Sequence, residues 1–309
     1  MREPVVNETL QVERTRRWWL WLLAAGTVVW AIAVAITVLT QDTILVPTVI
    51  LLGSFLVPTT VVAFALSRSD ASHLTVEMLL LGFVLGGTLA VPLTALTETF
   101  LLPSQYGTFL SVGAIEETGK GVVLVALAGL VKTRGARGGM ILGATVGAGF
   151  ASFESAGYAF GAIIGHGDDH PVYRIVETEL SRAALAPFGH ITWTALLGGA
   201  LFTGTRLLSR GAAWTFAGIV ALHGAWDAST GWAIILTNGL MGDGWDVGWP
   251  NTEAWIGTPT GSRLVVFQVA YTSLLLVISA IGAAWVVRRW RRAAPARVTR
   301  PGPAAAPPA

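Results

Sequence analysis

The stretch Gly113–Leu124, GAIEETGKGVVL, carries two adjacent glutamates, Glu116 and Glu117, and one lysine, Lys120. It lies inside an apolar run over 107–130, which is long enough for a membrane-spanning helix of ~20 residues. On a helix, Lys120 follows the two glutamates by four and three residues, so the three groups share one side. Each charged group inside a span costs about 2.5–3.5 kcal/mol on insertion scales. The stretch therefore predicts a functional site within a membrane protein.

The composition of the whole chain agrees with this interpretation. Its 309 residues are 53% hydrophobic and 12% charged, with a mean hydropathy of +0.63. A soluble domain carries about 25% charged residues, so a soluble protein is excluded. The chain has no cysteine, which excludes disulfides and thiolate metal sites. The expected partners are the lipid bilayer and a membrane-anchored protein, and no nucleic acid.

The apolar segments predict an all-α, polytopic membrane helix bundle of about eight transmembrane helices. The predicted spans are Trp18–Leu39, Ile44–Leu66, Val76–Leu96, Gly107–Val131, Gly138–Ile164, Ala183–Leu208, Ala212–Leu236 and Arg263–Val287. Residues 1–17 form a polar N-terminal segment and 18–287 the membrane domain. Residues 288–309 form a tail that is first basic and then rich in proline and alanine, a composition typical of disorder. The first span is too long for a cleaved signal peptide and is interpreted as an anchor.

The loop charges predict the orientation. Basic residues gather in alternate loops, at Arg68, Lys132, Arg134, Arg137, Arg206, Arg210 and Arg288–Arg292. The other loops hold the acidic residues Asp42, Glu98, Asp168, Asp169, Asp243, Asp246 and Glu253. By the positive-inside rule both termini are cytoplasmic, an N-in/C-in topology, and the acidic loops face outward. Arg174 and Arg182 on an outer loop are exceptions, and Val172–Arg182 there is expected to form a short interfacial helix.

Small residues and span-end charges have simpler interpretations. Glycines recur every four residues along the fifth span, at Gly139, Gly143 and Gly147 and again at Gly157, Gly161 and Gly165. Such spacing lets helices approach closely, so these glycines are expected to serve packing. Glu77 and Glu98 are expected at span ends, where a charge costs little.

Ionisable residues recur in the three spans that follow the glutamate pair. The fifth span has Glu154 in FESAGY, the sixth has His190 in FGHITWT, and the seventh has His223 and Asp227 in HGAWD. Counted from the outer end of each span at 1.5 Å per residue, these residues and Glu116 lie ~11–16 Å deep. Four helices thus place their ionisable groups in one layer, toward the outer side of the membrane.

Carboxylates and imidazoles around a water-accessible cavity suit hydrolysis. A glutamate can act as general base on water, and histidines can stabilise an oxyanion or bind a metal. Lys120 is expected to neutralise the glutamate pair, and Asp227 could hold His223 in one tautomer. The alternative is a proton-coupled transporter or channel that uses the same cluster. Transporters commonly show repeated halves and broken helices, which the sequence does not indicate.

The motifs together resemble a known family. EETGK at 116–120, FESAGY at 153–158, His190 and HGAWD at 223–227 resemble the motifs of the PrsW family of intramembrane proteases. That family is similar to the wider group of CAAX prenyl endopeptidases and bacteriocin-processing enzymes. The resemblance covers roughly 107–229. It implies cleavage of a membrane-anchored protein, such as an anti-sigma factor, near the extracytoplasmic face of the plasma membrane.

The resemblance also implies site residues. Glu116, Glu117 and Lys120 match the first motif, Glu154 the second, and His190 and His223 the later histidines, with Asp227 completing the catalytic set. Relatives in the wider group carry a histidine in the second motif where this chain has Tyr158. The metal question stays open: Glu154, His190 and His223 could hold zinc with an open position, or the enzyme could use glutamate and water without metal.

Overall fold

The computed structural model describes residues 17–67, 74–102, 109–130, 135–164, 171–203, 207–242 and 261–293. In these ranges the regular elements are helices, which confirms the predicted all-α bundle. Most of the predicted N-terminal segment 1–17 and the tail from residue 294 onward lie outside the described residues. So do the charged loop residues 68, 132, 134, 168, 169, 206, 243, 246 and 253, on which the predicted orientation partly rests.

Four helical segments are long and apolar enough to cross a membrane. They are α1 (Trp18–Thr40), α2 (Val46–Leu66) with the 3₁₀ turn Thr43–Leu45 before it, the segment Val76–Leu101, and α11 (Ser262–Arg292). The apolar stretch of each segment carries few charges, and at most a third of its residues are buried inside the protein. Most of the apolar surface of these segments therefore faces outward. These segments agree with the first, second, third and last predicted spans.

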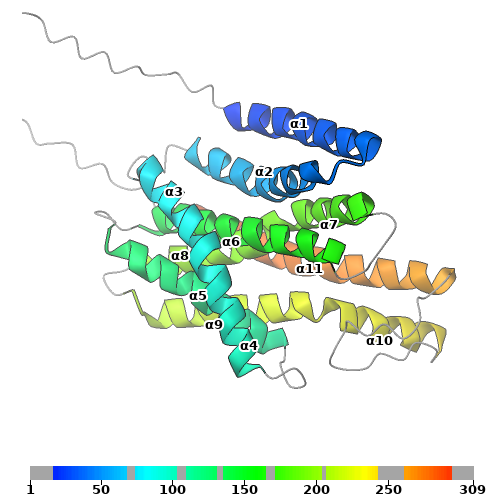
Figure 1. Ribbon diagram of the computed structural model, residues 1–309. Coiled ribbons are helices and arrows are strands. Elements are labelled where there is room, and N and C mark those ends of the chain that lie inside the picture. The colour runs from blue at the N-terminus through cyan, green and yellow to red at the C-terminus, as the bar shows by residue number, and fades with distance from the viewer. Residues whose placement is uncertain are drawn as a thin grey trace, which may run out of the picture.

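The segment Val76–Leu101 is not one regular helix. It consists of α3 (Val76–Leu85), a π-helical turn at Gly86–Ala90, and α4 (Val91–Leu101). A Cβ on Gly86 would collide with the carbonyl oxygen of Val146, so the turn lies directly against α6. Figure 1 shows α3 and α4 crossing the other helices at a steep angle. The helix extends five residues beyond the predicted end, and it carries the partly buried Glu98 on α4, which packs against α5.

The centre of the bundle is formed by α5 (Phe109–Ala128), α6 (Ala136–Ile164) and α8 (His190–Leu201). Neighbouring helices rather than lipid surround α8, in which residues 191–201 are all buried. The main apolar core lies here and includes Leu124, Leu142, Phe150, Trp193 and Leu196. Central helices can carry charges and glycines because protein covers them on most sides.

The predicted sixth span, Ala183–Leu208, is wrong. The chain forms α7 (Pro171–Leu185), a 3₁₀ turn at Ala186–Phe188, and then α8, which ends at Leu201. Together α7 and α8 run antiparallel to α6 along its length, since α8 packs on the first half of α6 and α7 on the second. The helix predicted over Val172–Arg182 is confirmed as part of α7. The predicted span failed because its first residues, from Ala183, belong to α7, and the described chain directly after Leu201 is no longer helical.

Close backbone packing explains how α8 is held. The Gly139, Gly143 and Gly147 stripe of α6 faces the α8 backbone, and a Cβ on Gly147 would lie 2.5 Å from the carbonyl oxygen of His190. The packing role predicted for these three glycines is therefore confirmed. A Cβ added at Gly157 or Gly161 would meet nothing within 4 Å, so their spacing has no such role among the described residues.

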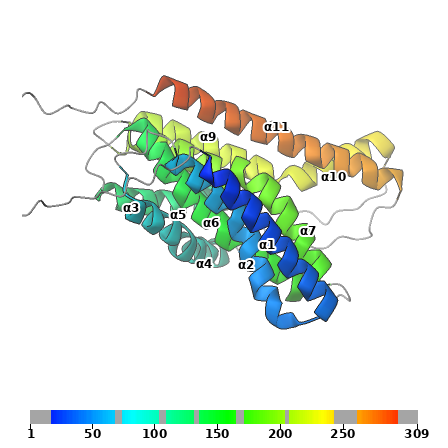
Figure 2. The same ribbon diagram turned by 90° about the horizontal axis from the view of Figure 1, so that it is seen from above.

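The predicted seventh span, Ala212–Leu236, is also broken. It consists of α9 (Arg210–Asp227) and α10 (Ser229–Met241), bent by 52° at their junction. The sequence interpretation that helices are unbroken was thus wrong in two places, between α7 and α8 and between α9 and α10. Figure 2 shows the start of α1 and the end of α11 toward the same end of the bundle, which fits an even number of crossings.

Candidate active site

Three charged side chains of α5 form a buried ionic group. Lys120 Nζ lies 2.8 Å from Glu117 Oε1 and 3.2 Å from Glu116 Oε2, as the helical spacing predicts. Lys120 and Glu117 are completely buried, whereas a tenth of the Glu116 side chain is exposed. The Lys120 ammonium also lies 3.9 Å from the centre of the Phe150 ring, a favourable cation–π contact. The two adjacent glutamates therefore differ: Glu117 is completely enclosed, whereas Glu116 keeps a small exposed fraction.

His190 stands at the first position of α8, where the glycine stripe of α6 fixes the backbone. Its Nδ1 lies 2.8 Å from Lys120 Nζ, and its Nε2 lies 2.9 Å from Glu154 Oε2. An ammonium only donates and a carboxylate only accepts, so Nδ1 accepts and Nε2–H donates. His190 is thereby held as the neutral Nε2–H tautomer, with its lone pair directed to the side of Lys120 and Glu116.

Glu154 of α6 is held by a residue from the neighbouring helix α7. The Arg182 guanidinium donates to Glu154 Oε2, and its Nε donates to Ser155 Oγ at 2.7 Å. The same guanidinium lies 4.4 Å from the Tyr158 ring centre. Arg182, an exception in the predicted orientation, thus has a place in the site, and Tyr158 packs on it. Sequence reasoning assigned no role to Arg182, because α7 was expected outside the site.

His223 of α9 faces three carboxylates. Its Nδ1 lies 3.1 Å from Glu117 Oε1, and its Nε2 lies 3.6 Å from both Glu116 Oε2 and Asp227 Oδ2. Since Glu117 accepts from Nδ1–H, the lone pair of neutral His223 is on Nε2, toward Glu116. Close packing of α5 and α9 sets this geometry, because a Cβ on Gly224 would lie 2.9 Å from Leu110 Cα.

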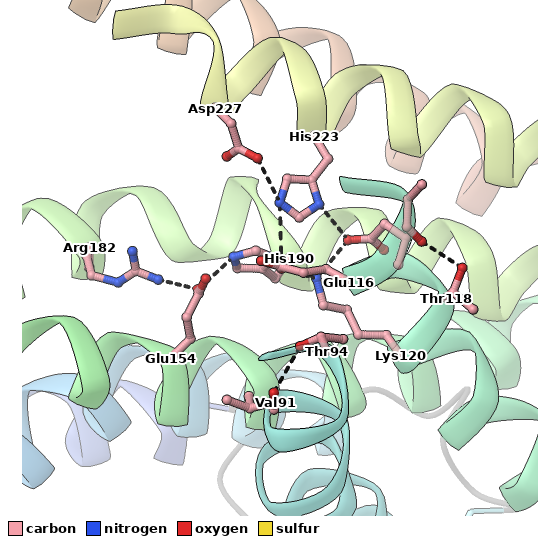
Figure 3. Close-up of polar contacts among 12 residues, drawn as sticks. Val91, Thr94, Glu116, Thr118, Lys120, Glu154, Arg182, His190, His223 and Asp227 are labelled. Atoms are coloured by element: carbon pink, nitrogen blue, oxygen red, sulfur yellow. Dashed lines mark hydrogen bonds and ion pairs between the residues drawn. The ribbon is translucent and has the colours of Figure 1, made fainter. Parts of the chain in front are cut away.

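The structure brings all seven predicted site residues together, as Figure 3 shows for six of them. Within this cluster, donor atoms of Glu116, His190 and His223 lie within 4.8 Å of one another, as a metal site requires. The ligand set suggested by the sequence had Glu154 in place of Glu116. Glu154 instead pairs with Arg182 and with the Nε2 side of His190, because α6 carries it to the far side of the imidazole.

The donor set fits a catalytic metal. Two imidazoles and one carboxylate form a recognised zinc site, and the second nitrogen of each histidine is hydrogen-bonded to a carboxylate, Glu117 or Glu154. That arrangement fixes the tautomers that leave one lone pair on each histidine for a metal. A bound cation would compete with Lys120, which contacts both Glu116 and His190.

Two further residues belong to the site but were missed from the sequence. Trp193 is fully buried, with its ring centre 4.6 Å from that of His223 and 5.6 Å from that of His190. Its spacing of three residues after His190 on a helix could have indicated a shared face. Glu98 interacts electrostatically with Glu116, Glu154, His223 and Asp227. It was missed because the end of α4 was expected at the membrane surface, where charge is common.

A polar cavity of about 510 Å³ adjoins the cluster. His190, Arg182, Tyr158, Trp193 and Trp226 are among the residues that line it. Asp227 and Glu154 also keep 25% and 16% of their side chains exposed. The cluster is therefore accessible from one side, as a site that takes up water and substrate must be.

Comparison with known proteins gives one result. No curated protein and no solved structure matches the chain, but a family model described as PrsW family intramembrane metalloprotease matches residues 75–243. The match covers more than half of the chain and extends on both sides of the region that carries the sequence resemblance. It includes every residue of the cluster. The chain belongs to the PrsW family of intramembrane metalloproteases and is therefore a membrane-embedded hydrolase.

Proposed function

We propose that the protein is an endopeptidase that cleaves a membrane-anchored protein, such as an anti-sigma factor, near the extracytoplasmic side of the membrane. The observation that carries the proposal is the group of Glu116, His190 and His223, whose donor atoms lie within 4.8 Å of one another beside a polar cavity. A water molecule at this group would meet one carboxylate and two imidazoles, the side chains that hydrolysis most often uses.

The charges of the cluster support a bound divalent cation. Glu116, Glu117, Glu154 and Asp227 bring four negative charges, and Lys120 and Arg182 bring two positive ones. With neutral histidines and a protonated Glu98, the cluster carries two uncompensated negative charges in a largely buried place. Burying unpaired charge costs several kcal/mol per ion, so two protons or one divalent cation must balance it. The Nε2 lone pair of His223 faces Glu116 at 3.6 Å, and His190 Nδ1, which accepts from Lys120, lies 3.8 Å from the same carboxylate. This donor set favours the cation, and we propose zinc.

Glu116, His190 and His223 would hold the zinc ion. When bound, zinc supplies a water molecule whose pKa is close to neutrality. Glu117 and Glu154 accept the remaining N–H groups of the histidines, and Lys120 keeps the glutamate pair compensated. In sites of this kind such partners typically contribute 10–100-fold to metal affinity or activity.

Asp227 is the carboxylate that we assign to proton transfer. Its Oδ2 is buried, has no hydrogen-bond partner among the described residues, and lies 3.6 Å from His223 Nε2. The water oxygen bonds to the carbonyl carbon of the scissile peptide while Asp227 takes the water proton. The C–N bond then breaks, and the same proton passes to the leaving amine. In a metal-free mechanism, Glu116 takes this proton instead. Treatment with a chelator distinguishes the two mechanisms, because only the metal-free enzyme would still cleave its substrate.

We also propose that the protein lies in the plasma membrane and crosses it eight times, with both termini in the cytoplasm. The support is that α5, α6, the α7–α8 pair and the α9–α10 pair complete a bundle with the four apolar segments. In addition, α11 ends with Arg288, Arg289, Arg291 and Arg292, a charge pattern typical of the cytoplasmic side.

Proteolysis by the purified protein tests the function. The protein is reconstituted in liposomes with a single-span substrate, and cleavage is followed by mass spectrometry, with Glu116→Gln as the inactive reference. Fragments that form only with the unaltered protein support the peptidase. Intact substrate together with proton-driven solute uptake would instead support the transporter interpretation.

A further inference from the structure

A polar cavity separates α7 from α11 at the level of the active site. It is lined by Thr178, Ser181 and Arg182 of α7 on one side and by Gln268 and Tyr271 of α11 on the other. Figures 1 and 2 both place α7 beside the first half of α11. His190, with 13% of its side chain exposed, and the exposed Glu177 line the same space, which therefore connects the surface of the bundle with the proposed catalytic group.

The two walls are polar where a lipid-facing helix would be apolar. Ser181 on α7 and Gln268 on α11 are both exposed, and Glu177 on α7 is 58% exposed. Exposed polar groups within a bilayer are costly unless they line a water-filled cavity or meet a polar partner. On its other side α7 packs Ile175 and the buried Glu179 against α1 and α2, where Trp30 Nε1 donates to Glu179 Oε2 at 2.8 Å. Thr178, Ser181 and Arg182 are left to line the cavity.

Two other grooves of similar volume differ from this cavity. The groove between α5 and α9, about 430 Å³, is lined by apolar side chains such as Val122, Leu201 and Phe216. The groove between α2 and α11, about 410 Å³, is lined by residues such as Phe64, Ile191 and Val286. None of the seven predicted site residues lines either of them. Their chemistry suits lipid chains or apolar helix faces.

We infer that the α7–α11 cavity is the lateral entry for the substrate, and this inference rests on the proposed peptidase function. The occupant is a short, locally unwound segment of a membrane-anchored protein. Unwinding a helix frees backbone N–H and C=O groups, and in a bilayer these must find new partners. The Gln268 amide can donate and accept such bonds, and the Ser181 hydroxyl oxygen, whose proton goes to the Thr178 carbonyl, can accept one. The volume of about 510 Å³ lies within the usual range of ~300–1,000 Å³ for ligand sites.

Reversible cross-linking tests the entry. Because the chain has no cysteine, the pair Ser181→Cys and Gln268→Cys can be linked selectively across the cavity with a cleavable bis-maleimide. The same sample is assayed with the single-span substrate before linking, after linking, and after cleavage of the linker. We expect the link to abolish cleavage and its removal to restore it.

A second pair controls for general rigidity. Val125→Cys and Ala213→Cys line the apolar groove between α5 and α9, and the same reagent links them on another face of the bundle. Cleavage should continue in this linked protein. The inference is overturned if the protein linked between 181 and 268 still cleaves the substrate, or if the links at 181–268 and 125–213 stop cleavage equally.

A trapping experiment does not depend on turnover. Ser181→Cys is combined with Glu116→Gln, and the substrate carries one cysteine beside its cleavage site. A disulfide-linked complex that forms at position 181, and not at a cysteine placed at Ala213, supports entry between α7 and α11. Cross-links at 213 alone, or equally at both, overturn it. If trapping at 181 succeeds while no variant or unaltered protein cleaves, the peptidase proposal fails and the binding surface stands.

Discussion

The imidazole of His223 lies with Nδ1 3.1 Å from Glu117 Oε1, while its Nε2 faces Glu116 Oε2 at 3.6 Å. One histidine thus joins two glutamates that are adjacent in sequence, and each glutamate meets a different ring nitrogen. Glu117 is fully enclosed on the Nδ1 side of the ring, and Glu116, a tenth of whose side chain is exposed, lies on the Nε2 side. The two carboxylates therefore have different surroundings, and we propose different roles for them.

Substitution of the two glutamates should separate these roles. Glu116→Gln removes a proposed ligand and should abolish cleavage, since groups acting on the reacting water contribute about 10²–10⁴-fold. Glu117→Gln leaves the ligands in place and should lower zinc affinity or cleavage ~10–100-fold. Initial rates and zinc titration measure both. Glu77→Gln at the exposed start of α3 serves as control and should be unchanged. Equal losses in both glutamate variants would contradict the division of roles.

Metal removal should stop the reaction. Protein purified without added metal should contain one zinc per chain, as our ligand assignment requires, and should lose cleavage after a strong chelator. Adding zinc should restore it. His190→Ala and His223→Ala should lose zinc, whereas Glu154→Gln should keep it with ~10–100-fold lower affinity. Elemental analysis supplies the metal content. Full cleavage by metal-free protein would reject the zinc site and assign proton transfer to Glu116.

Lys120→Met should make stability depend on zinc. Removing one partner of a buried ion pair costs ~3–5 kcal/mol because the remaining charge stays buried. The metal-free variant should therefore unfold at a lower temperature than the unaltered protein, and added zinc should raise its Tm by a larger increment. Thermal-shift assays in detergent measure this. Arg210→Met at the exposed start of α9 is the control. If zinc raised the Tm of Lys120→Met and of the unaltered protein by the same amount, Lys120 and zinc would not compensate the same charges.

Two glycine substitutions on α6 should differ in effect. Gly143→Ala places a Cβ against the Thr194 carbonyl of α8 and should destabilise by ~1–3 kcal/mol through overpacking, with loss of cleavage because His190 moves. Gly161→Ala meets nothing within 4 Å and should be neutral or stabilise by ~0.5–1 kcal/mol. Denaturation in mixed micelles compares the two variants. A Gly143→Ala protein with unchanged stability and activity would show that α6 and α8 are not fixed this tightly.

Topology reporters should fix the side of cleavage. Reporters inserted at residues 165–170 or 243–260 should be extracytoplasmic, and a reporter after Arg292 should be cytoplasmic, because the basic end of α11 favours the inner face. Paired phosphatase and fluorescent-protein fusions measure this. The reversed pattern would overturn the orientation and move the proposed cleavage to the cytoplasmic side.

The sequence by itself determined the class of the protein and most of its candidate site. Apolar length decides membrane insertion, so α1, α2, Val76–Leu101 and α11 could be identified from composition. Helical spacing alone brings Lys120 to both glutamates, because residues three and four apart lie on one face. An uncompensated charge is costly inside the bilayer, and this cost alone indicates functional positions at four further residues, Glu154, His190, His223 and Asp227.

Only the tertiary structure decided which of these residues face each other. The position of Arg182 against Glu154 depends on the break between α7 and α8, and α7 is packed against α2 and α6 on one side and faces a polar cavity on the other. The group of three donors contains Glu116 and not Glu154, which the sequence had suggested. The reason is that α5 and α6 place these two glutamates on opposite sides of the His190 ring. Contacts between helices far apart in sequence follow from backbone packing at positions such as Gly147 and Gly224, and local periodicity carries no information about that packing.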